Sequence, residues 1–212
     1  MPERGSFDRD KLNQILDEAL ICHVGFVTDD EPFVIPTSFC RTGEEIVLHG
    51  SSASRMLRVA RSGVPICVCV TLVDGLVLAR SAFHQSVNYR SAVIFGRARE
   101  VEEREEKVDA LHALSEHIVP GRWDEIRKPT DLELKATSVL AIPLNEYSVK
   151  IRVGPPKDDE EDYALPIWAG VLPLHMDTGD PVTDERVREE TKIPEYVTRY
   201  SRTNATRGKR YV

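Results

Sequence analysis

Short apolar runs separated by tight polar turns dominate the chain before residue 50. The three runs, each rich in strand-forming residues, are His23–Thr28, Pro32–Cys40 and Glu45–His49. Runs of this length joined by short turns are typical of an antiparallel meander. Pro36 lies inside the second run and has no backbone N–H, which predicts an edge strand, a bulge or a break that faces a ligand.

Helical periodicity precedes and follows this meander. An apolar stripe near the start predicts a helix over Asp8–Leu20 with Asp8 as its N-cap. The members of the stripe are Leu12, Ile15, Leu16 and Ala19. A glutamate-rich start and an apolar face predict a long helix over Glu102–Val119, and Thr130–Lys135 has the pattern of a short capped helix.

The later strands are longer and apolar on both faces. Ile66–Ala79 is predicted as a strand with an interruption at Asp74–Gly75, and Arg90–Val101 as another. Val139–Pro143 and Tyr147–Val153 are predicted as the last two strands. Two apolar faces favour a closed or two-sheet barrel over a sheet with one buried face. We therefore expect a mainly β (α+β) fold with flanking helices.

Composition limits the classes of function. The chain has 212 residues, enough for one well-buried core, and a net charge of −7, which does not favour nonspecific nucleic-acid binding. No apolar run approaches the length of a membrane-spanning helix, and Met1–Gly5 lacks the apolar core of a signal peptide. These features predict a cytoplasmic protein with no nucleic-acid and no membrane partner.

The spacing of cysteines and histidines does not predict a metal site. Cys67 and Cys69 are two residues apart in an apolar run, so they share a strand face and do not form a C-x-x-C pair. His112 and His117 are five residues apart, which is not the spacing of a helical metal pair. We expect the four cysteines to be reduced core residues and both histidines to be structural or solvated.

The turn between residues 49 and 55 carries the strongest candidate chemistry. An apolar strand ends at His49–Gly50, and serines lead into a helix expected from about Ser52, capped by Ser51 or Ser52. Free N–H groups at a helix N-terminus bind anions, and the Ser54 hydroxyl and the Arg55 guanidinium would strengthen such a site. An ordinary capped helix start is the alternative, and it is favoured on local sequence alone.

The composition changes at Gly154. Residues 155–162 form a polar, acidic linker, and the apolar island 167–174 is expected to dock on the core. We therefore divide the chain into a barrel domain, 1–153, and a C-terminal extension, 154–212. Basic residues at the end of the chain could contact an acidic partner or subunit, although a solvated tail is the favoured interpretation. These residues are Arg199, Arg202, Arg207, Lys209 and Arg210.

The order of these elements resembles the pyridoxamine 5′-phosphate oxidase-like flavin-binding family, and most of all its nitroimidazole-resistance branch. The resemblance covers roughly residues 5–153. It rests on the helix, the meander, the His49–Arg55 turn, the long apolar strand, and Asn88–Ser91 opening the strand Ala92–Gly96. Such proteins have an FMN-binding split β-barrel fold and form homodimers with two FMN molecules at the interface. The resemblance implies the same fold, cofactor and homodimer here.

The resemblance also implies which residues bind FMN. Ser54 and Arg55 match the pair whose basic side chain binds the phosphate. The backbone segment that lines the isoalloxazine ring corresponds to Ile35, Pro36, Thr37 and Ser38. The strand end under the ribityl chain and ring corresponds to His49, Gly50 and Ser51. The segment that reaches the cofactor from the other subunit corresponds to Asn88, Tyr89, Arg90 and Ser91.

His49 is the candidate catalytic residue, because a neutral imidazole near a flavin can donate a proton. A histidine that only packs on the ring or satisfies a backbone group is an equally weighted alternative. We predict an FMN-dependent oxidoreductase that passes electrons to a small-molecule acceptor. A non-enzymatic flavin binder for storage, sensing or delivery is the first alternative, and a barrel without flavin that binds a protein partner is the second.

The sequence also bears on the substrate and on the identity of the cofactor. The chain lacks the ending with Arg and His residues that grips the substrate phosphate in pyridoxamine oxidases, so pyridoxamine phosphate is not the expected substrate. A deazaflavin or a haem in place of FMN is left open, since related barrels hold these groups.

Overall fold

A computed structural model describes residues 5–202. Most strands are short and joined to their neighbours by tight turns, as the meander pattern predicts. In chain order the elements are β1 (Gly5–Ser6), α1 (Arg9–Glu18), β2 (Ile21–Thr28), β3 (Glu31–Thr42), β4 (Glu45–Ser51), α2 (Arg55–Arg61), β5 (Ile66–Leu78), β6 (Ser86–Gly96), β7 (Arg99–Glu100), α3 (Arg104–Ile118), α4 (Asp131–Ala136), β8 (Thr137–Pro143), β9 (Glu146–Arg152), a 3₁₀ helix (Glu160–Ala164), β10 (Gly170–Pro173) and α5 (Glu195–Thr198).

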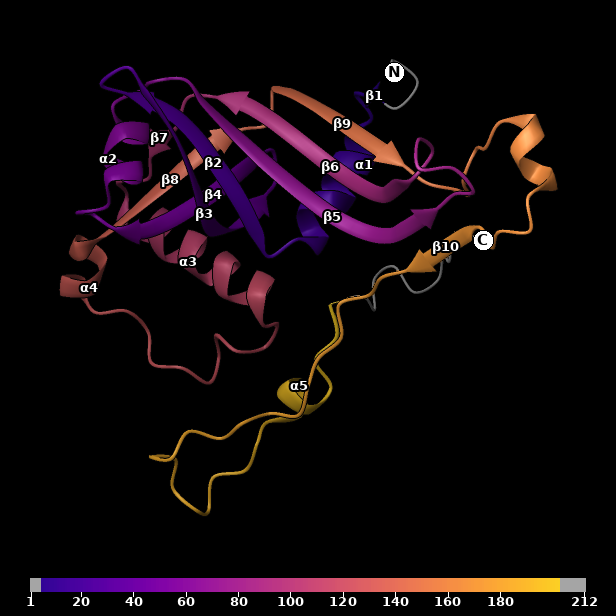
Figure 1. The fold of residues 1–212 in the computed structure, drawn as a ribbon. Helices are drawn as coiled ribbons and strands as arrows, with labels where there is room; N and C mark the ends of the chain where they lie inside the picture. Colours follow the sequence, from indigo (N-terminus) through magenta and orange to yellow (C-terminus); the bar gives the residue numbers. More distant parts are fainter. Residues whose placement is uncertain (1–4, 203–212) are drawn as a thin grey trace.

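The strands within residues 5–202 form one curled antiparallel sheet (Figure 1). Their order is β1-β9-β6-β5-β2-β3-β4-β8-β7, and β10 pairs with β5 beside this path. Strand β3 belongs to both halves of the curl, because residues 31–38 pair with β2 and residues 39–42 pair with β4. The predicted mainly β split barrel with flanking helices is therefore confirmed.

The main core fills the concave side of the sheet. Helix α1 packs there with its predicted stripe of Leu12, Ile15, Leu16 and Ala19, and each of these side chains is buried. The helix begins as expected, because the Asp8 carboxylate accepts hydrogen bonds from the N–H groups of Asp10 and Lys11 at 3.0 and 3.2 Å. Helix α2 packs on the same side through Leu57 and Ala60.

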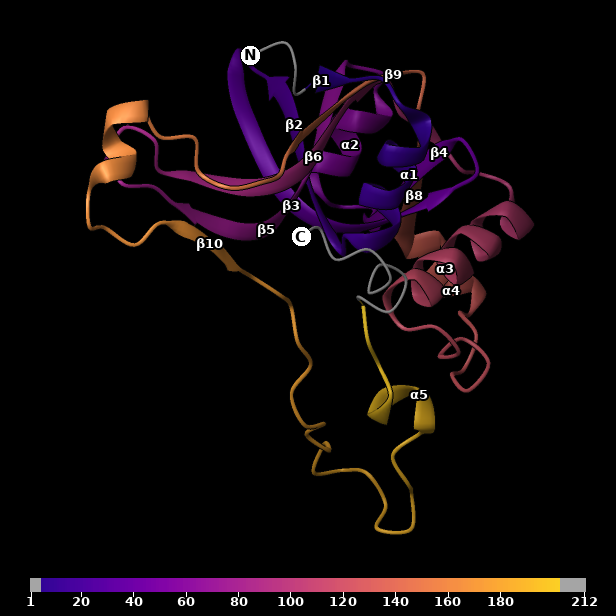
Figure 2. The same cartoon turned by 90° about the vertical axis from the view of Figure 1, so that its right-hand side faces the viewer.

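A second, smaller core lies on the other face of β3, β4 and β8. Helix α3 covers this face with Ala110 and Leu114 (Figure 2). The strand residues beneath it are Cys40, Val47, Val139 and Ala141. These strands are therefore buried on both faces here, which explains the uninterrupted apolar runs Ile46–Leu48 and Val139–Ile142.

Helix α2 and strand β6 differ most from the prediction. Helix α2 begins at Arg55, and Ser54 at its N-cap position makes no capping side-chain hydrogen bond, so the prediction of Ser51 or Ser52 as the cap is wrong. The Ser51 hydroxyl instead accepts a hydrogen bond from the N–H of Ala53 at 3.2 Å within the preceding turn. Strand β6 runs from Ser86 to Gly96, so residues 88–91 lie inside the strand and do not open it, and the prediction of one strand over Arg90–Val101 is wrong because Arg99–Glu100 forms the separate strand β7, paired with β8.

Strand β6 begins earlier than predicted because its pairing with β5 continues beyond a bulge in β5. The register between β5 and β6 shifts between Val73 and Gly75, and pairing then resumes as far as Val77 and Ser86. Strand β10 pairs with the same part of β5, and a Cβ on Gly75 would lie only 3.0 Å from the carbonyl oxygen of Leu172. Glycine at position 75 therefore permits the close approach of β10.

The cysteines are unpaired, as expected. Cys22 and Cys40 are buried, and burial raises the pKa of each thiol to about 12. Cys67 and Cys69 are half-buried on the convex face of β5. Of the basic residues near the C-terminus, Arg207, Lys209 and Arg210 lie outside the described residues. Within residues 5–202, no helix is both long enough and apolar enough to span a membrane.

Candidate functional site

The predicted site lies where β3 and β4 separate. The last pair between these strands joins Phe39 to Leu48. Beyond it, Ile35–Ser38 is paired with β2 alone and His49–Ser51 with β8 alone, within the described part of the chain. The backbone groups on the two facing edges therefore have no strand partner, and such groups seek hydrogen bonds elsewhere. Pro36 lies on one of these edges, in keeping with its predicted role as a break.

His49 presents an unsatisfied nitrogen at this point. The side chain is half-buried, and burial lowers the pKa of the imidazole. Its Nδ1 atom is buried and makes no hydrogen bond with any described residue. A buried polar atom without a partner costs free energy, so its presence in a folded protein calls for an explanation such as a ligand.

Arg55 lies directly after the turn, with its guanidinium exposed. Its central carbon is 4.2 Å from the centroid of the Phe33 ring, and Phe33 in turn stacks on Phe26 with centroids 5.5 Å apart. No carboxylate among residues 5–202 forms an ion pair with Arg55. A guanidinium supported on an aromatic face keeps its N–H groups available for an anion.

Strand alternation distributes the predicted residues over both faces of the sheet. The concave face receives Ile35, Thr37 and Gly50, whereas Pro36, Ser38, His49 and Ser51 have the opposite orientation. A Cβ on Gly50 would lie 3.1 Å from Cδ1 of Leu57, so a larger residue would push α2 away from the strand. The residues from β3, β4 and the turn before α2 thus surround the separation of the two strands.

Residues 88–91 lie elsewhere in the sheet. Ser38 pairs with Ile21 of β2, and Ser91 pairs with Thr71 of β5, so two strands separate Ser38 from Ser91. Three strand spacings amount to about 14 Å. One chain alone therefore does not bring residues 88–91 to the separation of β3 and β4, and their contact with a cofactor of another subunit stays a prediction.

All four of these side chains already have contacts within the chain. Asn88 is buried; its amide donates to the carbonyl of Gly154 at 3.2 Å, and its carbonyl oxygen accepts from Arg152. Tyr89 and Ser91 lie half-exposed on the convex face, where the Ser91 hydroxyl donates to the carbonyl of Lys150 at 3.4 Å and the Lys150 ammonium lies 5.8 Å from the centroid of the Tyr89 ring.

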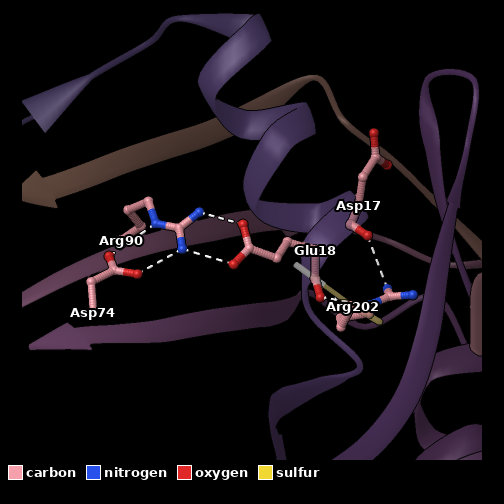
Figure 3. Close-up of polar contacts among 5 residues, drawn as sticks. All are labelled: Asp17, Glu18, Asp74, Arg90 and Arg202. Atoms are coloured by element: carbon pink, nitrogen blue, oxygen red, sulfur yellow. Dashed lines mark hydrogen bonds and ion pairs between the residues drawn. The ribbon is translucent and has the colours of Figure 1, made fainter. Parts of the chain in front are cut away.

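Arg90 is held between two carboxylates on the concave side (Figure 3). It donates to both oxygens of Glu18 at 2.5 and 2.9 Å and to both oxygens of Asp74 at 2.6 and 2.9 Å. The hydrogen bonds to Glu18, followed by those to Asp74, raise the pKa of Arg90. In this structure Arg90 therefore ties the end of α1 to the bulge of β5. Sequence reasoning missed this, because Glu18 and Arg90 are separated by 72 residues.

Two further features lie away from the separation of β3 and β4. His84, Asp159 and Asp162 gather at the tip of the β5–β6 hairpin with their potential ligand atoms within 4.8 Å of one another, a set that sequence reasoning did not identify. His84 Nδ1 is 2.8 Å from the Ser81 hydroxyl, while Asp159 is largely exposed. A hollow of about 550 Å³ contains none of the predicted site residues. It is lined by Phe7, Phe95, Asn145, Glu146, Tyr147 and Ser148.

Comparisons with known proteins agree with the resemblance seen in the sequence. A family model described as pyridoxamine 5′-phosphate oxidase matches residues 8–151. The flavocytochrome Anf3 from Azotobacter vinelandii is 38% identical with a TM-score of 0.87, over 92% of this chain and 91% of that chain. The FAD and haem binding protein from Mycobacterium smegmatis is 39% identical with a TM-score of 0.88, over 92% and 96%.

A more distant structure shares the fold alone. It is a candidate 5-nitroimidazole antibiotic resistance protein from Bacteroides thetaiotaomicron, 22% identical with a TM-score of 0.58, over 69% of this chain and 86% of that chain. No curated protein matches the chain. The family model spans more than half of the sequence, and two solved structures match it nearly from end to end. The chain therefore belongs to the pyridoxamine 5′-phosphate oxidase family.

Proposed function

We propose that this chain binds a flavin where β3 and β4 separate and uses it for redox chemistry. The observation that carries the proposal is the presence beside this separation of two unpaired strand edges, an unsatisfied His49 nitrogen and an Arg55 guanidinium that forms no ion pair with a described carboxylate. A flavin requires hydrogen-bonding groups for its ring and a cationic site for its phosphate, so these groups match its chemistry. Two relatives of 38% and 39% identity, named as a flavocytochrome and as an FAD and haem binding protein, support it.

Each group has a distinct role in this proposal. Arg55, with the Ser54 hydroxyl, binds the phosphate, and the free backbone edge of Ile35–Ser38 meets the polar rim of the ring. The resemblance in sequence predicts FMN. FAD is the second candidate, because the relative from Mycobacterium smegmatis is named for FAD. When bound, a flavin supplies the capacity to take electrons from a reductant and pass them to a small acceptor.

His49 acts in its neutral form. Because burial lowers the pKa of this imidazole, the uncharged ring dominates at neutral pH. A neutral imidazole has one donor and one acceptor nitrogen, so it can hydrogen bond to the flavin or hold a proton for the acceptor.

Two copies form a homodimer through the convex face of β2, β3, β5 and β6. The residues on this face are Ile21, His23, Gly25, Val27, Pro32, Val34, Pro36, Ser38, Cys67, Cys69, Thr71, Val73, Tyr89, Ser91, Val93 and Phe95. None of them is Asp, Glu, Lys or Arg, although 30% of the chain is charged. A solvated sheet face normally alternates to polar residues, and the centre of an interface is depleted of charge. The absence of charged residues therefore favours burial of this face against a second copy.

A haem is the second cofactor that we propose, on the names of the same two relatives. Haem iron is commonly held by histidine. The imidazoles of His23, on the uncharged face, and His175, in the extension, form no hydrogen bond or ion pair with described residues. His23→Ala and His175→Ala variants, compared by the intensity of the Soret band, identify the ligand; unchanged bands in both exclude these two residues.

The absorbance spectrum of freshly purified protein and the mass of the ligand released from it test the proposed function. Flavin bands with an FMN or FAD mass support it. Reduction of the flavin by NADH or NADPH and its reoxidation at useful rates separate an oxidoreductase from a storage, sensing or delivery protein. Colourless protein whose melting temperature is unchanged by added FMN or FAD would exclude flavin binding.

A further inference from the structure

The segment after β10 extends away from the body of the protein. Every residue from Leu172 to Ile193 is exposed. Figures 1 and 2 both show this segment projecting from the curled sheet and returning through α5. We call residues 174–193 the C-terminal loop. Loops of this length without secondary structure are uncommon in compact domains unless they serve binding or function.

The first end of the C-terminal loop is fixed at the edge of β5. Strand β2 pairs with β5 at Cys67–Cys69, and β10 pairs with it at Gly75–Leu78. The N–H of Leu174 adds one more bond, 3.1 Å to the carbonyl of Asp74. Further pairing along β5 would run into the start of β2, so the chain must leave the sheet at this point.

The second end is fixed on α1 and α3. The Tyr200 hydroxyl donates to the carbonyl of Ile118 at 2.8 Å, and the Tyr196 hydroxyl donates to Glu125 at 2.6 Å. The Arg202 guanidinium donates to the carbonyls of Asp17 and Glu18 at 2.9 and 2.8 Å, at the C-terminal end of α1 (Figure 3). Free carbonyls at a helix C-terminus favour a cation, so this contact is a strong anchor.

Between these anchors the loop exposes apolar side chains that its own chain does not cover. The exposed fractions are 67% for Met176 and 97% for Val182, and Leu174, Val187 and Ile193 are each at least 40% exposed. Since both ends are fixed, these side chains are held away from the body. Contact with another surface would remove this apolar area from water, which is favourable.

We propose that the C-terminal loop of one copy lies on a second copy of this chain, along its uncharged convex face. This inference rests on the homodimer of the proposed function but not on the flavin. Each chain has both a loop with exposed apolar side chains and an uncharged face. In a dimer with two-fold symmetry the loop of each copy lies on the face of the other, so both surfaces are buried.

The length and charge of the C-terminal loop are compatible with docking on a second copy. Twenty residues that run out and back can reach about 30 Å, whereas the four strands of the face span about 14 Å between their outer axes. Six acidic and three basic residues of the loop can stay solvated while its apolar side chains contact the face. This mixture is typical of the rim of an interface, beside an uncharged centre.

A photo-crosslinker placed in the loop tests this inference. The side chain p-benzoylphenylalanine replaces Val182 in the full-length protein, and irradiated samples are separated on a denaturing gel. Leu132 of α4, which is 78% exposed, carries the same group as a control. A crosslink between copies doubles the apparent mass, while a crosslink within one copy does not. We expect doubled mass at position 182, well above that at position 132, with crosslinked peptides from β2, β3 or β5.

Light scattering and flavin content of the same samples separate the possible failures. Dimeric, flavin-loaded protein without a doubled band above the control would overturn the loop inference and leave the proposed function intact. Monomeric protein would overturn both the dimer and the loop. A Val182→Asp variant gives an independent measure: the dimer should dissociate roughly tenfold more readily, whereas Leu132→Asp leaves it unchanged.

Discussion

Three arginines show how the surroundings of a guanidinium decide its role. Arg90 is bound on both sides by Glu18 and Asp74, and Arg202 donates to carbonyls at the end of α1. Arg55 instead lies over the Phe33 ring and forms no ion pair with a described residue. Of the three, Arg55 is the one whose donors can meet an external anion.

Arg90→Met should destabilise the protein markedly. Loss of the guanidinium leaves two mostly buried carboxylates without their cation, which typically costs about 3 kcal/mol in the free energy of unfolding. Arg104→Met removes an exposed pair with Asp131 and should cost less than about 1 kcal/mol. Urea unfolding of both variants measures the difference in their free energies of unfolding. Equal losses of stability would show that the charge of Arg90 does not stabilise the fold.

At the scale of elements, α4 shows how local sequence can determine a helix start. The Thr130 hydroxyl accepts from the N–H of Glu133 at 3.3 Å, and the Glu133 carboxylate accepts from the N–H of Thr130 at 2.7 Å. This capping box satisfies two N–H groups that a helix start leaves unpaired. Arg127 holds the same carboxylate at 2.7 Å.

Glu133 should titrate well below an ordinary glutamate. The hydrogen bond from Arg127, followed by those from Thr130, lowers the pKa of Glu133 from 4.5 to about 2. Because the folded-state pKa is the lower one, the stability that this carboxylate adds is present above pH 4.5 and is lost as the pH falls toward 2. NMR titration of the side-chain carboxyl measures the midpoint, and a midpoint near 4.5 would contradict this assignment.

Elements determined by nearby residues could be predicted from the sequence, whereas those determined by distant contacts could not. Asp8 caps α1 as expected, because its partners are two and three residues away. The start of β6 was misplaced, because the bulge near Gly75 and the pairing partner lie on another strand. The candidate site shows the same difference. Residues 49–55 are adjacent in sequence and could be predicted together, whereas Glu18 and Asp74 are distant from Arg90 in sequence and could not be predicted as its partners.

At the scale of the whole molecule, the distribution of charge is uneven. The chain carries 35 acidic and 28 basic residues, yet the convex face of β2, β3, β5 and β6 carries none of them. Helices α1 and α2 pack on the concave face and α3 packs on the outer face of β3, β4 and β8, whereas no described helix contributes a core residue to this face. The face and the C-terminal loop together are explained by a second copy.

A charge placed on the uncharged face should prevent dimer formation. Val34 lies on this face and is 66% exposed, so Val34→Arg should fold normally while placing an unpaired cation in the interface. Light scattering should give about 48 kDa for the unchanged protein, twice the 23.9 kDa chain, and about half of that for the variant. Leu132→Arg, on exposed α4, should stay dimeric. A dimeric Val34→Arg protein would place the interface elsewhere.

The flavin dissociation constants of Arg55→Ala and Arg58→Ala test the central claim most directly. Both arginines are exposed on α2, but Arg55 alone lies next to the turn that joins β4 to this helix. A charge-assisted hydrogen bond to the phosphate contributes about 1 to 3 kcal/mol, so Arg55→Ala should weaken binding roughly fivefold to 150-fold while Arg58→Ala stays within about twofold. Equal affinities in the two variants would contradict a phosphate site at Arg55.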